Sequence, residues 1–449
     1  MQKSGRTPLL RARKLEKVFD IGEIYIKLEG ANPTGHKHDR IAETIVKDAI
    51  ARGLKTIVVN GSYSYIRSIK YFAELEQIRI IVPVFKKEAW KSRRFDASEI
   101  VKFKNIQDDA MMTVLKEYAF DQKAYLAVEG HSSTHLSQMS MESLTEEIFK
   151  KAKFNIDTIF TKLSYGYTLT STYSTMLRYW IDGRIDKYPK VICGTWAGAN
   201  SIYEYYKKTN EVQDESVEER EENEQPANRI QIDKQLLEES LQAVFETKGE
   251  IHPVDEALLK ESAKLLRKYE HIKVTPDEAY PFAAFYQMAN SGKLTHGRHV
   301  IVLNDAKSIV KVDNLNDFDD VSKEKLIELT REWLAQYSDS LLETEDAIHN
   351  AMESGYILLA SRNDQYEGIC VLVHTGFENF IPTYHLAYVG TDKTSKGRGV
   401  ATELIQRAID LSEGKLSLHV DLDNKGAKKL YEKLGFKHCY NRMIYKEDQ

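Results

Sequence analysis

A basic, glycine-containing turn at residues 396–401 opens a helical pattern that continues to Ile409. The first N–H groups of such a helix are unpaired, and together with the helix dipole they form an anion site suited to a pyrophosphate. Gly397 and Gly399 let the backbone approach the phosphates closely, and Ala401 keeps the helix entrance unobstructed. An ordinary tight turn has the same composition, so the surrounding elements decide between the two interpretations.

The segments around this turn predict one α+β domain of about 140 residues, a normal domain size. Its predicted strands are 308–312, 356–362, 367–375, 383–389 and 415–421. The middle three are expected to be consecutive antiparallel strands. Its predicted helices are 322–337, 343–354, 399–414 and 424–435. We therefore assign residues 308–449 to a separate domain.

Two motifs in this region resemble those of the GNAT family of acetyl-CoA-dependent N-acyltransferases. The family signature Arg/Gln-x-x-Gly-x-Gly/Ala matches Lys396, Gly399 and Ala401, with lysine as a conservative departure. A second family segment matches Asn424, Ala427, Tyr431, Gly435 and Phe436. The resemblance covers roughly residues 309–449 and implies that acetyl-CoA is bound. The coenzyme-binding residues that it implies are Val389, Lys396, Gly397, Arg398, Gly399, Val400, Ala401 and Asn424.

The resemblance also implies a reaction path. An acceptor amine, whose pKa is about 10.4 in a free lysine side chain, must lose a proton before it attacks the thioester carbonyl. Tyr431 is the implied general acid that protonates the departing thiolate. For the general base, His385 on one predicted strand and His419 or Asp421 on the next stay open as alternatives that act through water.

Residues 1–307 alternate short apolar runs with longer helical patterns. The runs that predict buried strands are 23–29, 56–60, 78–85, 157–163, 190–194 and 299–304. Helical spacing that ends in glycine predicts helices at 39–53 and 169–183. Such alternation implies an α/β domain with a mostly parallel sheet covered on both faces.

This first domain resembles fold type II pyridoxal phosphate enzymes, the tryptophan synthase β-like group that includes threonine synthase and cysteine synthase. The matching stretches occur in the family's order. They are TPLLRARKLEK, IYIKLEGANPTG, ICGTWAGANSIYEYY, VDEALLKESAKLL, IKVTPDEAYPFAAFYQM and HVIVLND. The resemblance implies the fold of these enzymes and raises the question whether pyridoxal phosphate is bound.

The lysine that forms the Schiff base in this family is displaced. The family reads Asn-Pro-Thr-Gly-Ser-Phe-Lys-Asp-Arg, whereas residues 32–40 read NPTGHKHDR. His38 therefore occupies the lysine position, and an imidazole cannot form the Schiff base. Lys37 lies one place earlier, which turns its side chain by about 100° on a helix, so it is expected to need a local register shift. His36 and His38 need not be ligands.

Other cofactor contacts are altered as well. The family's Ser-Gly-Asn loop aligns with residues 62–64, and its glycine-rich phosphate loop aligns with residues 164–168, in which only Gly166 remains. The family's Ser or Thr opposite the pyridine nitrogen aligns with Asn304. These changes predict a domain that kept the fold and gave up the cofactor, so pyridoxal phosphate is doubtful. The residues that would line the remaining cleft are Lys37, His38, Ser64, Gly166, Thr168 and Asn304.

Composition limits the class of protein. A formal net charge of −5 argues against a general nucleic-acid or membrane-surface role. Three widely spaced cysteines provide neither a disulfide framework nor a thiolate metal site, which fits a reducing cytoplasm. No secretory signal or membrane-spanning run is predicted. The acidic stretch 211–225 is interpreted as a solvated insert.

We thus predict an N-acetyltransferase whose catalysis lies at 308–449, with a degenerate first domain for ligand binding, regulation or dimerisation. Its expected partner is a small-molecule amine or amino acid, which a cleft filled by Tyr63, Tyr165 and Tyr167 could hold by stacking and hydrogen bonds. One alternative is a bifunctional enzyme that also carries a pyridoxal phosphate-dependent lyase, synthase or racemase activity. A non-catalytic sensor of an amino acid or coenzyme A is the other.

Overall fold

The computed structural model describes residues 3–96, 99–103, 110–196, 200–211, 232–270, 272–308, 311–314, 321–337, 339–362, 365–395, 399–421 and 423–439. The chain divides into two compact units, Met1–Lys307 (unit 1) and Ser308–Gln449 (unit 2). Apart from residue 211, the acidic stretch 211–225 lies outside the described residues. No helix among these described ranges is long and apolar enough to cross a membrane.

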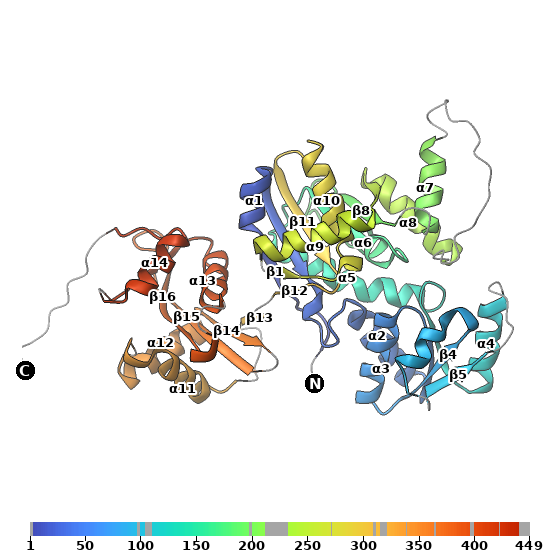
Figure 1. Ribbon diagram of the computed structural model, residues 1–449, viewed down its shortest axis with the longest axis horizontal. Coiled ribbons are helices and arrows are strands. Elements are labelled where there is room, and N and C mark those ends of the chain that lie inside the picture. Colours follow the sequence, from blue (N-terminus) through green and yellow to red (C-terminus); the bar gives the residue numbers. More distant parts are fainter. Residues whose placement is uncertain are drawn as a thin grey trace, which may run out of the picture. The chain divides into compact units, whose positions relative to one another are not determined.

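The larger sheet of unit 1 has six strands, all parallel to their neighbours except the first (Figure 1). Their order is β1 (Leu9–Arg11), β2 (Gly22–Leu28), β11 (Gly297–Leu303), β7 (Thr158–Lys162), β8 (Lys190–Thr195) and β9 (Glu250–Pro253). Val300 and Val302 of β11 belong to one apolar cluster, whereas Ile301 and Leu303 belong to another. Because successive residues of a strand point to opposite faces, the sheet has a core on each face.

A second, four-stranded parallel sheet completes unit 1. Its order is β5 (Ile100–Lys102), β4 (Arg79–Val84), β3 (Thr56–Asn60) and β6 (Tyr125–Val128). The buried strands of unit 1 are confirmed where the sequence predicted them, but they form two sheets instead of one. The reason is that apolar runs identify strands without specifying their partners, and the chain builds β3 to β6 between β2 and β7 of the other sheet.

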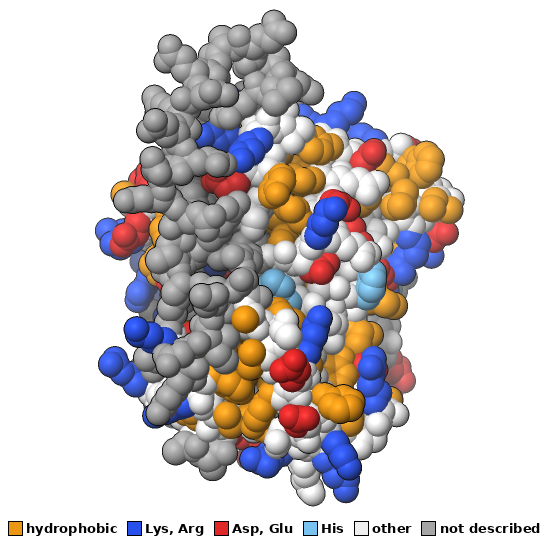
Figure 2. All heavy atoms as spheres, turned by 90° about the vertical axis from the view of Figure 1, so that its right-hand side faces the viewer, with side chains coloured by type: hydrophobic (Ala, Val, Ile, Leu, Met, Phe, Trp, Pro, Cys, Tyr) orange, Lys and Arg blue, Asp and Glu red, His pale blue; other side chains and the backbone are white. Residues whose placement is uncertain are grey.

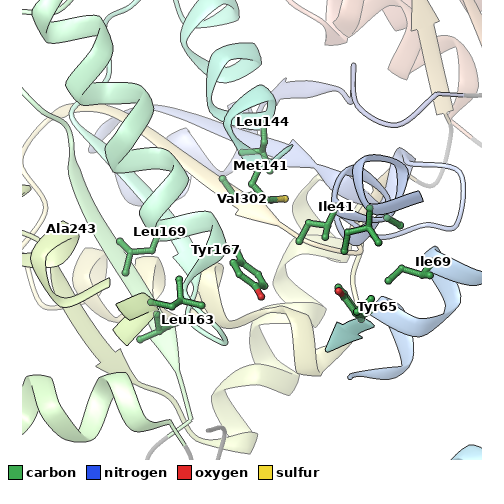
Figure 3. Packing of buried hydrophobic residues seen from close by; sticks show 14 of the residues in the cluster. Ile41, Tyr65, Ile69, Met141, Leu144, Leu163, Tyr167, Leu169, Ala243 and Val302 are labelled. Atoms are coloured by element: carbon green, nitrogen blue, oxygen red, sulfur yellow. The ribbon is translucent and has the colours of Figure 1, made fainter. Parts of the chain in front are cut away.

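Helices cover both faces of these sheets. The helices of unit 1 are α1 (Arg13–Phe19), α2 (His38–Ala51), α3 (Tyr63–Leu75), α4 (Met111–Asp121), α5 (Thr134–Lys151), α6 (Tyr167–Ile181), α7 (Ser201–Glu211), α8 (Lys234–Glu246), α9 (Glu256–Glu270) and α10 (Tyr280–Asn290). A two-stranded sheet joins β10 (Ile272–Lys273) and β12 (Lys307–Ser308). In the larger cluster, side chains of α2, α5, α6 and α8 pack on the sheets (Figure 3).

In unit 2 the described residues form a five-stranded sheet with two α-helices on each face. The strand order is β13 (Lys311–Asn314), β14 (Tyr356–Arg362), β15 (Gln365–His374), β16 (Tyr384–Thr391) and β17 (Leu416–Leu418). Only the last pair is parallel. One apolar cluster contains α11 (Lys323–Leu334) and α12 (Leu341–Glu353), and the other contains α13 (Val400–Leu411) and α14 (Lys425–Lys433). The predicted antiparallel strands and helices of this domain are confirmed.

Figure 2 shows one face of the molecule, on which basic side chains are interspersed with acidic ones instead of gathering in a single patch. The described side chains on this face therefore form no extended basic track for a polyanion.

Candidate functional site

The predicted anion site of unit 2 lies where α13 begins. Gly399 is the N-cap residue and has a φ of 88°, a left-handed conformation that glycine adopts at little cost. Among the described residues, no atom lies within 4 Å of the position that a Cβ atom on Gly399 would take. The side chain of Val400 is buried in the core, and Ala401 is half-buried. Lys396, Gly397 and Arg398 lie outside the described residues.

Strands β16 and β17 pair over a short stretch only. Tyr384–Leu386 pairs with Leu416–Leu418, where β17 ends, while β16 continues to Thr391. The ladder between β15 and β16 shifts register at the same place, which leaves Ala387 as an extra residue. From Ala387 onward, Val389 included, β16 has no partner in the described β17. Among the described residues, the backbone groups of β16 on that edge thus have no strand partner beyond Leu386, and an edge of this kind can bind an extended ligand.

Two histidines lie next to this divergence. Nδ1 of His385 is 2.9 Å from Oγ of Ser417, and the rings of His385 and His419 are 4.4 Å apart. The Ser417 hydroxyl donates to the carbonyl oxygen of Tyr384 at 3.4 Å, so it accepts from Nδ1–H of His385 and leaves the basic lone pair on Nε2. His385 is half-buried, whereas His419 and Asp421 are exposed. A side chain of the neighbouring strand thus holds His385 in a fixed orientation.

Tyr431 lies in the core on the α13 face of the sheet. Burial raises the pKa of its phenol to about 12, with a smaller contribution from Cys370. The phenol is therefore protonated at neutral pH and has a proton to donate. Asn424 has a different local task, because its side-chain oxygen accepts from the N–H of Ala427 at 3.1 Å and caps α14.

In unit 1 two of the predicted cleft residues, His38 and Ser64, come together with a glutamate from a third element. His38 is the first residue of α2, Ser64 lies in the first turn of α3, and Glu129 follows β6. Nδ1 of His38 is 3.1 Å from Oγ of Ser64, and Nε2 is 3.2 Å from a carboxylate oxygen of Glu129. Burial lowers the pKa of His38 well below its ordinary value and raises that of Glu129. The sequence did not predict Glu129 as a site residue, because it belongs to none of the matched motifs.

Lys37 faces the start of α6 in the structure. Its Nζ donates to Oγ1 of Thr168 at 2.7 Å, and its backbone N–H donates to the carbonyl oxygen of Asn304. Burial lowers the pKa of Lys37 to about 8. The residue before α2 thus directs its side chain to the helix whose start aligns with the family's phosphate loop.

The glycine of that loop, Gly166, allows both a left-handed backbone conformation and a close approach to a neighbouring helix. Gly166 caps α6 with a φ of 87°, and a Cβ atom there would lie 2.2 Å from Oγ of Ser240 on α8. Tyr165 occupies the space beside Gly130, where a Cβ atom would lie 2.3 Å from its ring. The loop thus brings a helix start close to α8 and an aromatic ring into the interior.

The aromatic lining differs from the expectation. Tyr165 and Tyr167 stack with ring centroids 6.4 Å apart, but Tyr63 is exposed and packs against Trp90 and Phe95. Tyr65, two residues further along α3, is fully buried instead. Figure 3 shows its hydroxyl directed toward that of Tyr167. The side-chain period of a helix explains the correction, since Tyr63 and Tyr65 point in different directions.

Asn304 is buried and binds a carboxylate. Its Nδ2 donates to Glu278 at 2.7 Å, while its Oδ1 is buried without a partner among the described residues. Glu278 also accepts from Lys162 at 2.8 Å, and it lies 3.9 Å from Nε2 of His36. The Lys162 ammonium and His36 hold the pKa of Glu278 well below its usual range despite burial.

These side chains do not fit a cofactor attached through a Schiff base at position 38. An imidazole stands there with both of its ring nitrogens in contact with protein groups. The adjacent amine, that of Lys37, is engaged with Thr168. A buried acceptor on Asn304 and a lysine at a helix start are still features of a polar ligand site.

Comparison with known proteins places both units in families. The family model described as pyridoxal-phosphate dependent enzyme matches residues 1–305, and the acetyltransferase (GNAT) family model matches residues 324–436. Threonine synthase of Methanocaldococcus jannaschii is 24% identical over 305 residues, which are 67% of this chain and 73% of the relative. Threonine synthase of Methanosarcina acetivorans is 22% identical over 325 residues, 69% of this chain and 77% of the relative.

Among solved structures, O-ureido-L-serine synthase is similar with a TM-score of 0.50 and 16% identity, over 71% of this chain and 95% of that one. At this identity the likeness concerns the fold alone. Taken with the family matches, it agrees with the architecture of unit 1. The chain belongs to the pyridoxal-phosphate dependent enzyme family and carries at its C-terminus a domain of the acetyltransferase (GNAT) family.

Proposed function

We propose that the protein is an acetyl-CoA-dependent N-acetyltransferase that acts on a primary amine and that unit 2 carries the catalysis. The observation that carries this proposal is the divergence of β16 from β17 beside the start of α13. The free edge of β16 offers hydrogen bonds to an extended pantetheine arm. The helix start offers backbone N–H groups to the pyrophosphate.

In the proposed mechanism, the unit's own side chains move the protons. Nε2 of His385 takes the proton of the acceptor amine through water, and Ser417 keeps the ring oriented through Nδ1. The amine then attacks the thioester carbonyl, and strand and turn amides stabilise the negative charge on the carbonyl oxygen. Tyr431, which is protonated at neutral pH, supplies the proton for the leaving thiolate.

The role proposed for unit 1 is to bind a small amine or amino acid without Schiff-base chemistry, so as to regulate unit 2, present its substrate or support a homodimer. His38 in the lysine position supports this proposal. A reducing, cytoplasmic location fits the cysteine usage. The low net charge gives no reason to expect nucleic acid or membrane partners.

One observation favours a second candidate function, a bifunctional enzyme in which unit 1 is also an active pyridoxal phosphate enzyme. The amine of Lys37 lies in the cleft, and its pKa of about 8 leaves a larger neutral fraction at neutral pH than an exposed lysine has. Pyridoxal phosphate, when bound, supplies an electron sink for bonds at the α-carbon of an amino acid. Only a shift of the Lys37 amine away from Thr168 would make it available to that group.

Incubation of the full chain with acetyl-CoA and a panel of primary amines tests the leading proposal. Acetylated product is expected, and Tyr431→Phe is expected to lower the turnover number about tenfold with little change in acetyl-CoA affinity. The effect is modest because an alkyl thiol has a pKa of about 8.5 and leaves readily as thiolate. No product with any amine, or a Tyr431→Phe variant that binds acetyl-CoA weakly, would contradict the assignment.

Borohydride reduction separates the two candidate functions. We expect the purified full chain to show no Schiff-base absorbance and no pyridoxyl group fixed on Lys37, because His38 occupies the position of the family's lysine. The Lys37→Met variant is the control, because any pyridoxyl adduct found in it must lie on another lysine. A pyridoxyl adduct on Lys37, located by mass spectrometry, would instead establish the bifunctional alternative.

A further inference from the structure

A serine, a histidine and a glutamate lie in successive close contact in the interior of unit 1. Oγ of Ser64 is 3.1 Å from Nδ1 of His38, and Nε2 of His38 is 3.2 Å from a carboxylate oxygen of Glu129. The same three residue types, in the same order of contact, activate a serine for attack on carbonyl carbon in unrelated hydrolases. In such sites the order of contact and the roles decide, and the fold does not.

The burial of the three side chains increases from the serine to the acid. Ser64 is half-buried, whereas the side chains of His38 and Glu129 are only 7% and 1% exposed. A nucleophile must be reachable, and its base and acid are best kept from water. Burial increases from Ser64 to His38 to Glu129, as such a site requires.

Glu129 is fixed on both carboxylate oxygens. One oxygen contacts His38, and the other accepts from the backbone N–H of Ser62 at 2.7 Å. The backbone approaches the acid closely here, because a Cβ atom on Gly61 would lie 2.7 Å from the Glu129 side chain. A carboxylate oxygen 3.2 Å from Nε2 favours the tautomer with the proton on that nitrogen, and in this tautomer Nδ1 presents its lone pair to the serine hydroxyl.

We propose that Ser64 is a catalytic nucleophile, with His38 as its general base and Glu129 as the positioning residue, in an acyl-transfer or hydrolase site that is separate from the acetyltransferase chemistry of unit 2. The Ser64 proton passes to Nδ1 of His38 as Oγ bonds to the carbonyl carbon of an ester or thioester. The bond to the alkoxide or thiolate then breaks, and this leaving group takes the proton from His38. Water, deprotonated by His38, attacks the acyl group, and Oγ of Ser64 leaves and regains the proton.

The surroundings supply the other parts that such a reaction requires. Ser64 lies in the first turn of α3, where the side chain of Ser62 accepts from the N–H of Tyr65 at 3.4 Å. The N–H groups of Tyr63 and Ser64, which the helix cannot satisfy itself, can hold the oxyanion. The hydroxyl of Tyr65 is buried without a partner among the described residues, and its ring lies against that of His38 with centroids 5.7 Å apart. Lys37, next to His38, places an ammonium at the start of α6, which selects substrates that carry an anionic group.

A fluorophosphonate probe tests the proposal on the full chain. Oγ of an activated serine displaces fluoride from phosphorus, and tandem mass spectrometry locates the adduct. We expect labelling at Ser64 that Ser64→Ala abolishes and that His38→Gln slows about 100-fold. Ser174→Ala, on α6 and outside this network, is the control and should label as the native chain does. Hydrolysis of p-nitrophenyl acetate should follow the labelling rates.

Two results would overturn the proposal. One is that the probe leaves Ser64 unmodified, and the other is that Ser64 labels equally fast with and without the imidazole. If His38→Gln does not melt like the native chain, Glu129→Gln takes its place, since the amide keeps hydrogen-bonding capacity but loses the charge. If the three residues serve stability alone, these variants will change the melting temperature, and the probe will not label Ser64 in the native chain or in any variant.

Discussion

Replacing Gly399 by Asp is expected to weaken acetyl-CoA binding about 100-fold and to lower acetyl transfer at limiting coenzyme by the same factor. The added carboxylate would stand at the start of α13, where the space for a Cβ atom is open among the described residues. Two unit charges about 4 Å apart near a protein surface repel by up to about 4 kcal/mol. Part of that repulsion accounts for the expected loss, which calorimetric titration with acetyl-CoA measures.

Gly399→Asn is the matched control for this variant. Asparagine has nearly the size of aspartate, and both residues tolerate a positive φ better than other non-glycine residues, so both should fold alike. Only the aspartate adds a charge. If Gly399→Asp loses much of its affinity for acetyl-CoA and Gly399→Asn loses little, the pyrophosphate binds at the start of α13. Equal affinities of the two variants would place the coenzyme elsewhere.

The fold of unit 2 followed from the sequence almost completely, because its strands are adjacent in sequence and pair in order from β13 to β16. In unit 1 the same kind of pattern identified the strands but not their two sheets. β2 pairs with β11, about 270 residues later in the chain, and no local signal encodes such a partner. Long-range pairing is decided by the packing of whole layers, which a single sequence does not display.

The candidate sites show the same limit at the scale of single side chains. Motif alignment located His38 and Lys37, but the direction of each side chain depends on where α2 begins. The structure begins that helix at His38, so Lys37 reaches Thr168 and His38 reaches Ser64. Glu129 carries no motif, because a lone glutamate after a strand is common. Only the three-dimensional contact with His38 distinguishes it.

Lys37→Met is expected to stabilise the ligand-free protein at pH 7 and to lose that advantage as the pH rises. The pKa of Lys37 is lowered to about 8 by burial, from an ordinary value of 10.5, and its Nζ has a hydroxyl partner but no ion-pair partner among the described residues. Below pH 8 both the folded and the unfolded chain carry the proton, and the folded state bears the cost of the buried charge. Between pH 8 and 10.5 the unfolded chain keeps a proton that the folded chain has released, so the native protein gains stability with pH.

The full gain is on the order of 3 kcal/mol, of which about 2 kcal/mol falls between pH 7 and pH 9.5. The difference in unfolding free energy between Lys37→Met and the native chain should shrink by that amount, as measured by urea unfolding at both pH values. Lys47→Met is the control, because Lys47 lies on α2, the helix that Lys37 precedes, and its side chain is 68% exposed. This variant should differ from the native chain by less than about 0.5 kcal/mol. A pH-independent difference for Lys37→Met would mean that the amine is not desolvated. The buried ammonium of Lys37 has a hydroxyl partner but, among the described residues, no carboxylate partner, so an anion bound beside it can restore stability. A ligand with a carboxylate or phosphate group should therefore stabilise the native chain and leave Lys37→Met unchanged.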